Sequence, residues 1–197
     1  MTFMKFCGMT REQDVRLAGA LGVDAVGFVL WPTSPRAVDP ARLAALIRVL
    51  PTSTAPVGVF VSPSNDDLDR AIDAGIRIVQ IHGATAPGFV PPTTVWVSRS
   101  LEAGFDDVSR EMTLVLDAHD PARHGGTGQA IDWARAATIA AARRVVLAGG
   151  LTAANVTEAI RQVRPYGVDV ASGIEDRPGV KNAQAMEAFV AAVREAD

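Results

Sequence analysis

Short runs of apolar residues, many of them β-branched, recur along the chain and alternate with stretches in which Ala, Leu and Arg recur at helical spacing. The apolar runs are nearly continuous, which is typical of parallel strands that are covered on both faces. The pattern predicts eight strands, at residues 3–7, 25–30, 56–61, 77–82, 94–98, 113–118, 144–149 and 168–172.

The stretches between these runs predict helices at residues 11–21, 40–50, 65–74, 132–142, 152–163 and 181–195. Thr10 and Thr152 stand where the first and fifth of these helices begin, and a threonine hydroxyl can cap the free amides of a first turn. A glycine in the left-handed conformation commonly ends a helix. We expect that role for Gly22, Gly75 and Gly167.

Strands that alternate with helices predict a parallel sheet. Eight such units predict one closed (β/α)₈ TIM barrel that takes up residues 1–197 as a single domain, near the low end of about 200 residues for this fold. The segments after the fourth and fifth strands are short or rich in proline, so helices 4 and 5 should be shortened. An open doubly wound sheet is the alternative, but "CGMTRE" lacks the glycines of a dinucleotide loop.

The net charge is −3 and no basic stripe is present, which argues against a nucleic-acid partner. No apolar run approaches the ~20 residues of a membrane span. The start "MTFMKFCGMTREQD" lacks the apolar core of a secretory signal. A single cysteine cannot form an internal disulfide. We therefore expect a cytoplasmic protein without a membrane partner, and a monomer because no exposed apolar stripe is evident.

Two candidate acid–base residues follow strands of the expected barrel, whose active sites lie at the C-terminal ends of the strands. Cys7 ends the first apolar run. A free cysteine is usually a small buried hydrophobe, but a thiol at a strand end can act as a base or nucleophile when its pKa is lowered. Asp117 ends the sixth run. It is either a turn carboxylate or a general acid or base that faces Cys7 across the barrel.

Candidate binding residues follow other strands. Backbone amides after strands seven and eight often bind phosphate in such barrels, which points to Gly149, Gly150, Ser172 and Gly173. "GGTG" at 125–128, which contains Gly126, is either a plain connector or a loop that closes over a ligand.

Arg36, in a loop with prolines on both sides, is either a surface arginine or a bidentate clamp for a carboxylate. Gln80 and His82 end the fourth strand. The chain has three histidines and no spacing typical of a ligand set, so no metal site is expected.

Several stretches resemble the phosphoribosylanthranilate isomerase family from end to end. They are "KFCGMT", "GVDAVGFVLWPTSPR", "VGVFV", "VQIHG", "LVLDA", "GGTGQAIDW", "LAGGLTAANV" and "GVDVASGIEDRPGVKN". The resemblance implies a small (β/α)₈ barrel that needs no cofactor and acts on a small phosphorylated substrate in tryptophan biosynthesis. The implied reaction is the Amadori rearrangement of N-(5′-phosphoribosyl)anthranilate to 1-(2-carboxyphenylamino)-1-deoxyribulose 5-phosphate.

The resemblance also implies roles for the candidate residues. Asp117 would be the general acid, Cys7 the general base, and Arg36 the group that holds the anthranilate carboxylate. The remaining residues expected to contact the substrate are Gln80, His82, Gly126, Gly149, Gly150, Ser172 and Gly173. This chain departs from the family pattern at two places. The segment after "HG" lacks the acidic start and the apolar helix of the family, and Ile131 stands where an aromatic residue is usual.

Three rival functions differ from this one in testable features. The histidine-pathway isomerase performs the same chemistry but has an aspartate where Cys7 stands. An aldolase or synthase barrel would need a Schiff-base lysine, whereas Lys5 falls inside the first strand and Lys181 at the start of the last helix. A catalytically inactive ligand-binding barrel is disfavoured because both Cys7 and Asp117 are present.

Overall fold

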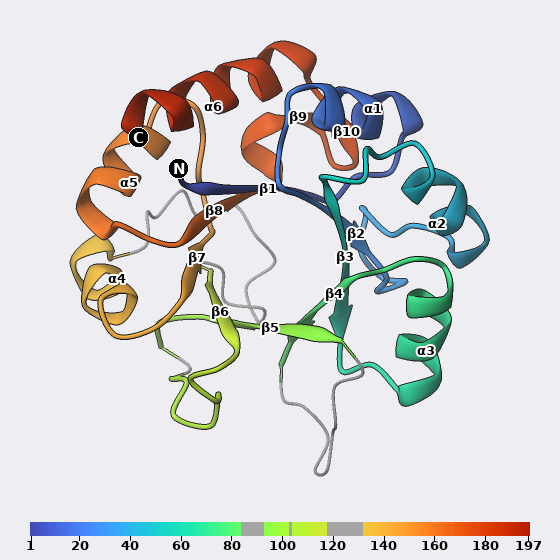
Figure 1. The fold of residues 1–197 in the computed structure, drawn as a ribbon, viewed down its shortest axis with the longest axis horizontal. Coiled ribbons are helices and arrows are strands. Elements are labelled where there is room, and N and C mark those ends of the chain that lie inside the picture. Colours follow the sequence, from blue (N-terminus) through green and yellow to red (C-terminus); the bar gives the residue numbers. More distant parts are fainter. Residues whose placement is uncertain (84–92, 103, 118–131) are drawn as a thin grey trace.

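The computed structural model describes residues 1–83, 93–102, 104–117 and 132–197 (Figure 1). Eight parallel strands follow one another in chain order and close into a barrel where β8 pairs with β1. The predicted (β/α)₈ architecture is confirmed. The strands are β1 Phe3–Cys7, β2 Ala25–Val29, β3 Ala55–Val61, β4 Ile78–His82, β5 Thr94–Arg99, β6 Thr113–Leu116, β7 Val145–Leu147 and β8 Gly167–Val170.

The helices lie around most of the outside of the barrel (Figure 1). They are α1 Glu12–Ala20, α2 Pro40–Ile47, α3 Asn65–Asp73, α4 Trp133–Ala140, α5 Val156–Val163 and α6 Ala183–Ala196. Each agrees with a predicted helix, although α5 begins at Val156 and not at residue 152. The described residues between β5 and β6 form turns without a helix, as the shortened fifth helix predicts. The segment expected to hold the fourth helix, 84–92, lies outside the described residues.

The side chains of the strands divide between two packed regions, because neighbours along a strand point to opposite faces. Outward-facing residues pack against the helices in the larger hydrophobic cluster. Inward-facing residues fill the barrel in two smaller clusters, one around Cys7 and Val57 and the other around Trp96 and Val115. The C-terminal strand ends form one rim above this filled interior.

Both predicted threonine caps are wrong. The residue that precedes α1 is Arg11, which makes no side-chain cap, and the Thr10 hydroxyl donates to the Gly179 carbonyl instead. The Thr152 main-chain N–H donates to Asn155 Oδ1 at 2.8 Å, and this turn delays the start of α5. Thr10 follows β1 and Thr152 follows β7. Both residues form part of the rim at the C-terminal ends of the strands and do not begin a helix.

Two of the three expected helix-ending glycines are confirmed: Gly22 and Gly75 follow helix ends with φ of 73° and 109°. Gly167 does not have this role, because Arg164 takes the left-handed position after α5 with φ of 50°. Gly167 begins β8, where a Cβ atom would lie 2.6 Å from the Phe3 carbonyl oxygen. Glycine at this position allows β8 to approach β1 closely.

A short antiparallel hairpin, which the sequence pattern did not predict, lies between β8 and α6. After the 3₁₀ turn η1 (Ser172–Ile174) come β9 (Glu175–Arg177) and β10 (Val180–Lys181). In Figure 1 the hairpin lies beside β1, between α6 and α1. It therefore covers the part of the rim where β1 and β8 end.

Candidate active site

Cys7 lies at the C-terminal end of β1 with its side chain inside the barrel. It is 9 % exposed and belongs to the interior cluster. On the neighbouring strand, a Cβ atom at Gly27 would stand 2.9 Å from Cys7 Sγ. The absence of a side chain at Gly27 thus leaves room for the thiol.

Asp117 directly follows β6 on the same rim. Its main-chain N–H donates to the Arg99 carbonyl at 3.0 Å, which continues the pairing with β5 beyond the end of the strand. Val115, two residues earlier, packs inside the barrel, so Asp117 lies on the inward side. Only β7 and β8 separate β6 from β1 on the shorter way round, so Asp117 and Cys7 approach the mouth from well-separated sides.

The surroundings of Cys7 act on its pKa in opposite directions. Burial raises the pKa of the thiol, and the nearby Asp169 carboxylate raises it as well. The positive charges of Lys5 and Lys181 lower it, without cancelling the effect of burial. Cys7 is therefore a neutral thiol near pH 7 in the free protein. The two ammonium groups are what reduce the cost of forming its thiolate.

Lys5 lies inside the barrel two residues before Cys7, on the same face of β1. Its Nζ is 2.6 Å from Asp169 Oδ2, and the two side chains are 0 % and 7 % exposed. Burial lowers the pKa of Lys5, but Asp169 and Cys7 together outweigh it and the net pKa is raised. Lys5 therefore stays charged beside Cys7.

Arg36 reaches the same rim from the loop after β2. A Cβ atom at Gly8 would stand 2.6 Å from Arg36 Cδ, so the arginine stem packs directly on the residue after Cys7. Gly8 also has φ of 74°, which favours glycine. The guanidinium donates from Nη2 to Glu175 Oε2 at 2.6 Å and from Nε to Oε1 at 3.0 Å.

Lys181 does not start the last helix, as the sequence suggested, but lies in β10. Its buried Nζ donates to the carbonyl of Cys7 at 2.6 Å, to that of Ala171 at 3.0 Å and to Glu175 Oε1 at 2.8 Å. Burial lowers the pKa of Lys181, and the Glu175 carboxylate opposes that effect. Because it donates to three oxygens, the ammonium is committed to holding the ends of β1 and β8 together.

The two glycine-bearing loops expected to bind phosphate lie side by side. Gly149 and Gly150 follow β7 with φ of 83° and 68°. Gly173 lies in η1 after β8, where a Cβ atom would stand 1.9 Å from the Leu151 carbonyl oxygen. Only glycine permits this contact, so Gly173 is what brings the loops after β7 and β8 together, with Ser172 at the start of η1.

Gln80 and His82 lie on the inward face of β4 at two depths. Gln80 is buried, and its Nε2 lies 3.3 Å from both Ser98 Oγ and His82 Nε2. His82 ends the strand at the rim. Gln80 therefore supports the residues above it from inside the barrel. The last expected contact, Gly126, lies outside the described residues.

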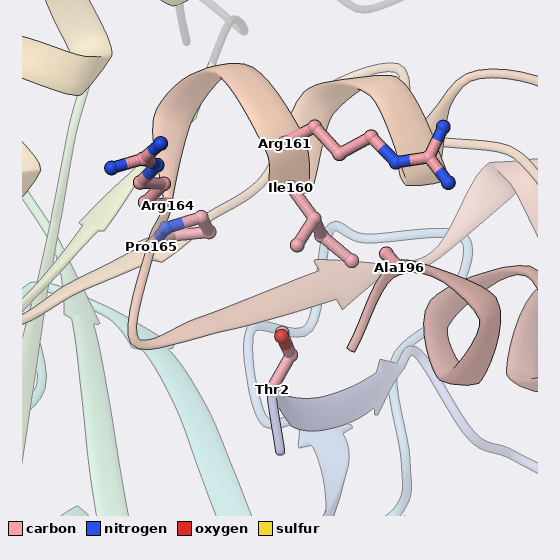
Figure 2. A pocket seen from close by; sticks show the side chains of 6 residues that line it. All are labelled: Thr2, Ile160, Arg161, Arg164, Pro165 and Ala196. Atoms are coloured by element: carbon pink, nitrogen blue, oxygen red, sulfur yellow. The ribbon is translucent and has the colours of Figure 1, made fainter.

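A pocket of about 420 Å³ lies at the opposite end of the barrel (Figure 2). Its lining residues include Thr2, just before β1, and Pro165, two residues before β8. It is therefore separate from the rim that carries Cys7. Within the described residues, no three His, Cys, Asp or Glu side chains gather as metal ligands, and no helix is long and apolar enough to cross a membrane.

Comparison with protein families identifies relatives along nearly the whole chain. Residues 4–192 match the family described as N-(5′-phosphoribosyl)anthranilate (PRA) isomerase. The N-(5′-phosphoribosyl)anthranilate isomerase of Pelobacter propionicus is 42 % identical over 99 % of this chain and 97 % of its own length. That of Chromohalobacter salexigens is also 42 % identical, over 98 % of this chain and 94 % of its own length.

Solved structures give the same result. The phosphoribosyl anthranilate isomerase of Thermotoga maritima superposes with a TM-score of 0.88 at 32 % identity, over 99 % of this chain and all of that chain. A phosphoribosyl anthranilate isomerase in complex with reduced 1-(o-carboxyphenylamino)-1-deoxyribulose 5-phosphate has a TM-score of 0.84 at 30 % identity, over 99 % of this chain and all of that chain.

Proposed function

The chain belongs to the N-(5′-phosphoribosyl)anthranilate isomerase family, and from this premise we propose that Cys7 and Asp117 carry out its acid–base chemistry. The chain catalyses the Amadori rearrangement of N-(5′-phosphoribosyl)anthranilate to 1-(2-carboxyphenylamino)-1-deoxyribulose 5-phosphate, an aldose–ketose isomerisation in tryptophan biosynthesis. The observation that carries the assignment of roles is that Cys7 ends β1 and Asp117 directly follows β6, on one rim of the barrel.

Ring opening is assigned to Asp117. Its carboxylic acid protonates the ribose ring oxygen while the bond from that oxygen to C1′ breaks. The lone pair of the anthranilate nitrogen forms the C1′=N bond and gives an open-chain iminium ion. A carboxylic acid is strong enough to donate here, and a positioned acid of this kind contributes typically ~10²–10⁴-fold.

Proton removal is assigned to Cys7. As a thiolate it takes the proton from C2′, the electron pair forms the C1′=C2′ bond, and the nitrogen regains its lone pair. The resulting enolamine then becomes the ketone when C2′–OH loses its proton and C1′ gains one. Lys5 and Lys181 lower the cost of the thiolate that this step requires.

The other groups of the rim are assigned to binding. Arg36 offers a guanidinium to the anthranilate carboxylate. Backbone amides of Gly149, Gly150, Ser172 and Gly173 are assigned to the phosphate, which the close packing of the two loops supports. Gln80, His82 and Gly126 complete the assigned substrate contacts. We also propose that the protein is a cytoplasmic monomer and that residues 1–197 form one domain; the pairing of β1 with β8, which closes the barrel, supports the single domain.

Turnover of the substrate tests this function. Phosphoribosylanthranilate is generated in situ from anthranilate and phosphoribosyl pyrophosphate, and its loss is followed with and without the protein. We expect conversion to the carboxyphenylamino ketose, with little conversion of the bisphosphorylated aminoaldose of the histidine pathway. A folded protein that converts neither substrate would overturn the assignment.

A further inference from the structure

Glu175 is buried at the point where Arg36 and Lys181 meet, and its side chain is only 2 % exposed. Its Oε1 accepts from Lys181 Nζ at 2.8 Å, from Arg36 Nε at 3.0 Å and from the Gly179 N–H at 3.1 Å. Its Oε2 accepts from Arg36 Nη2 at 2.6 Å. Donors from the β2 loop, the hairpin turn and β10 thus fix this carboxylate in one orientation.

The contact with Glu175 uses only one edge of the Arg36 guanidinium. A guanidinium carries five N–H donors in a plane and can engage carboxylates along more than one edge. Glu175 occupies the edge formed by Nε and Nη2. The edge formed by Nη1 and Nη2 retains one N–H on each nitrogen directed away from Glu175. Arg36 is 24 % exposed, so part of the guanidinium reaches the open side of the rim.

The charges of the cluster formed by Glu175, Arg36 and Lys181 favour the binding of a further anion. Burial acts to raise the pKa of Glu175, but hydrogen bonds from Arg36 and Lys181 outweigh it and hold the pKa below its usual range. Glu175 is therefore ionised at neutral pH. One buried carboxylate faces two cations, Arg36 and Lys181, so the cluster keeps one net positive charge that a ligand carboxylate can neutralise.

We propose that Glu175 is a positioning residue: it holds Arg36 so that only the Nη1/Nη2 edge meets the ligand, and it thereby makes the site selective for an ortho-carboxylated arylamine over an arylamine without a carboxylate. The proposal rests on the assignment of Arg36 to the anthranilate carboxylate. Glu175 itself has no contact with the substrate in this scheme. Neutral glutamine at position 175 keeps the size of the side chain but loses the charge and the bidentate acceptor that orient the guanidinium.

The test measures binding of two unreactive ligands by calorimetry. One is 1-(2-carboxyphenylamino)-1-deoxyribitol 5-phosphate, and the other is the same compound with a phenylamino group in place of the carboxyphenylamino group. For Glu175→Gln we expect the affinity for the carboxylated ligand to fall about 10-fold or more, the size of one charge-assisted interaction. The affinity for the phenylamino ligand should change less than about 2-fold.

Asp176→Asn is the matched control, because Asp176 is the adjacent acidic residue of β9 but pairs with Asn182 and does not contact Arg36. It should leave both affinities unchanged. If Glu175→Gln does not fold, Glu175→Asp keeps the charge on a shorter stem and should also weaken the carboxylated ligand selectively. Equal losses for both ligands would overturn the proposal and leave Glu175 a merely structural residue.

A separate outcome would overturn the assignment of Arg36. If the wild-type protein binds the two ligands equally, or if Arg36→Lys weakens both equally, Arg36 does not hold the carboxylate, and the inference about Glu175 fails with it. If wild type discriminates and Arg36→Lys abolishes discrimination while Glu175→Gln preserves it, only the inference about Glu175 is overturned.

Discussion

Lys5 and Asp169 form an ion pair of 2.6 Å in the interior of the barrel, across the seam where β1 pairs with β8. The pair lies two residues before Cys7 along β1, and both side chains are almost completely buried. The pair therefore places one positive and one negative charge close to the thiol of Cys7. Lys5 favours the thiolate of Cys7, and Asp169 disfavours it.

Substitutions in this pair should move the pKa of Cys7 in opposite directions. Lys5→Met removes a positive charge and should raise the pKa, whereas Asp169→Asn removes a negative charge and should lower it. Cys7 is the single cysteine of the chain, so the ultraviolet absorbance of the thiolate during a pH titration reports this residue, with Cys7→Ser as the blank. Shifts of the same sign in both variants would show that their effect on Cys7 is not electrostatic.

The alkylation rate of Cys7 should rise with pH into the alkaline range. Burial raises the pKa of Cys7 above the ordinary thiol value of about 8.5, so the fraction of protein with a thiolate increases with pH up to and beyond that value. The thiolate is the reactive form, so the rate of reaction with iodoacetamide should follow this increase. Mass spectrometry at a series of pH values measures this rate for wild type and Lys5→Met, and the rise should lie at higher pH in Lys5→Met. Identical profiles in the two proteins would show that Lys5 does not lower the pKa of Cys7.

Glu175 should stabilise the fold in a pH-dependent manner. Its pKa is lower in the folded protein than the value of about 4.3 in an unfolded chain, so its contribution is complete above that value and is lost as the pH falls through the folded pKa. The free energy of unfolding of wild type should therefore decrease more between about pH 5 and pH 3 than that of Glu175→Gln. Urea unfolding at a series of pH values measures the difference, and parallel curves for the two proteins would contradict it.

Gly173 should tolerate alanine much less well than Gly150 does. A Cβ atom at Gly173 meets the Leu151 carbonyl at 1.9 Å, while one at Gly150 meets nothing within 4 Å. The cost at Gly150 should be limited to its left-handed backbone, about 1–2 kcal/mol. Gly173→Ala must in addition separate the loops after β7 and β8, so it should be less stable and bind inorganic phosphate more weakly. Urea unfolding and phosphate titration of both variants check this order, and equal losses would contradict it.

Much of the fold followed from the sequence because the strands of a closed barrel are buried on both sides and have nearly continuous apolar runs. "FMKFC" and the sixth run, which contains "TLVL", were located from this pattern alone. The helix starts were less predictable. Thr10 could cap a helix as far as its type is concerned, but tertiary structure directs its hydroxyl to the β9–β10 hairpin.

Most of the candidate site was predicted from residues at or just after the ends of strands. Cys7, Asp117 and the glycines after β7 and β8 have such positions, and the structure brings them to one rim. Arg36 was predicted from its residue type in a proline-bracketed loop, and it reaches the same rim. Glu175 and Lys181 lie on a hairpin of five strand residues in all, too short to produce a periodic pattern. Lys5 carried one usable signal: it is two residues from Cys7 and must share its face of the strand. Nothing in the local sequence indicates that Asp169 is its partner 164 positions away.

The most direct test of the central claim is turnover of phosphoribosylanthranilate by wild type, Cys7→Ala and Asp117→Asn, each first shown to be folded by its urea unfolding transition. We expect rapid conversion by wild type and a loss of at least about 100-fold in kcat for each variant, since a positioned acid or base contributes typically ~10²–10⁴-fold. Binding of inorganic phosphate should persist in both variants. A folded Cys7→Ala protein that turns over at the wild-type rate would contradict the account.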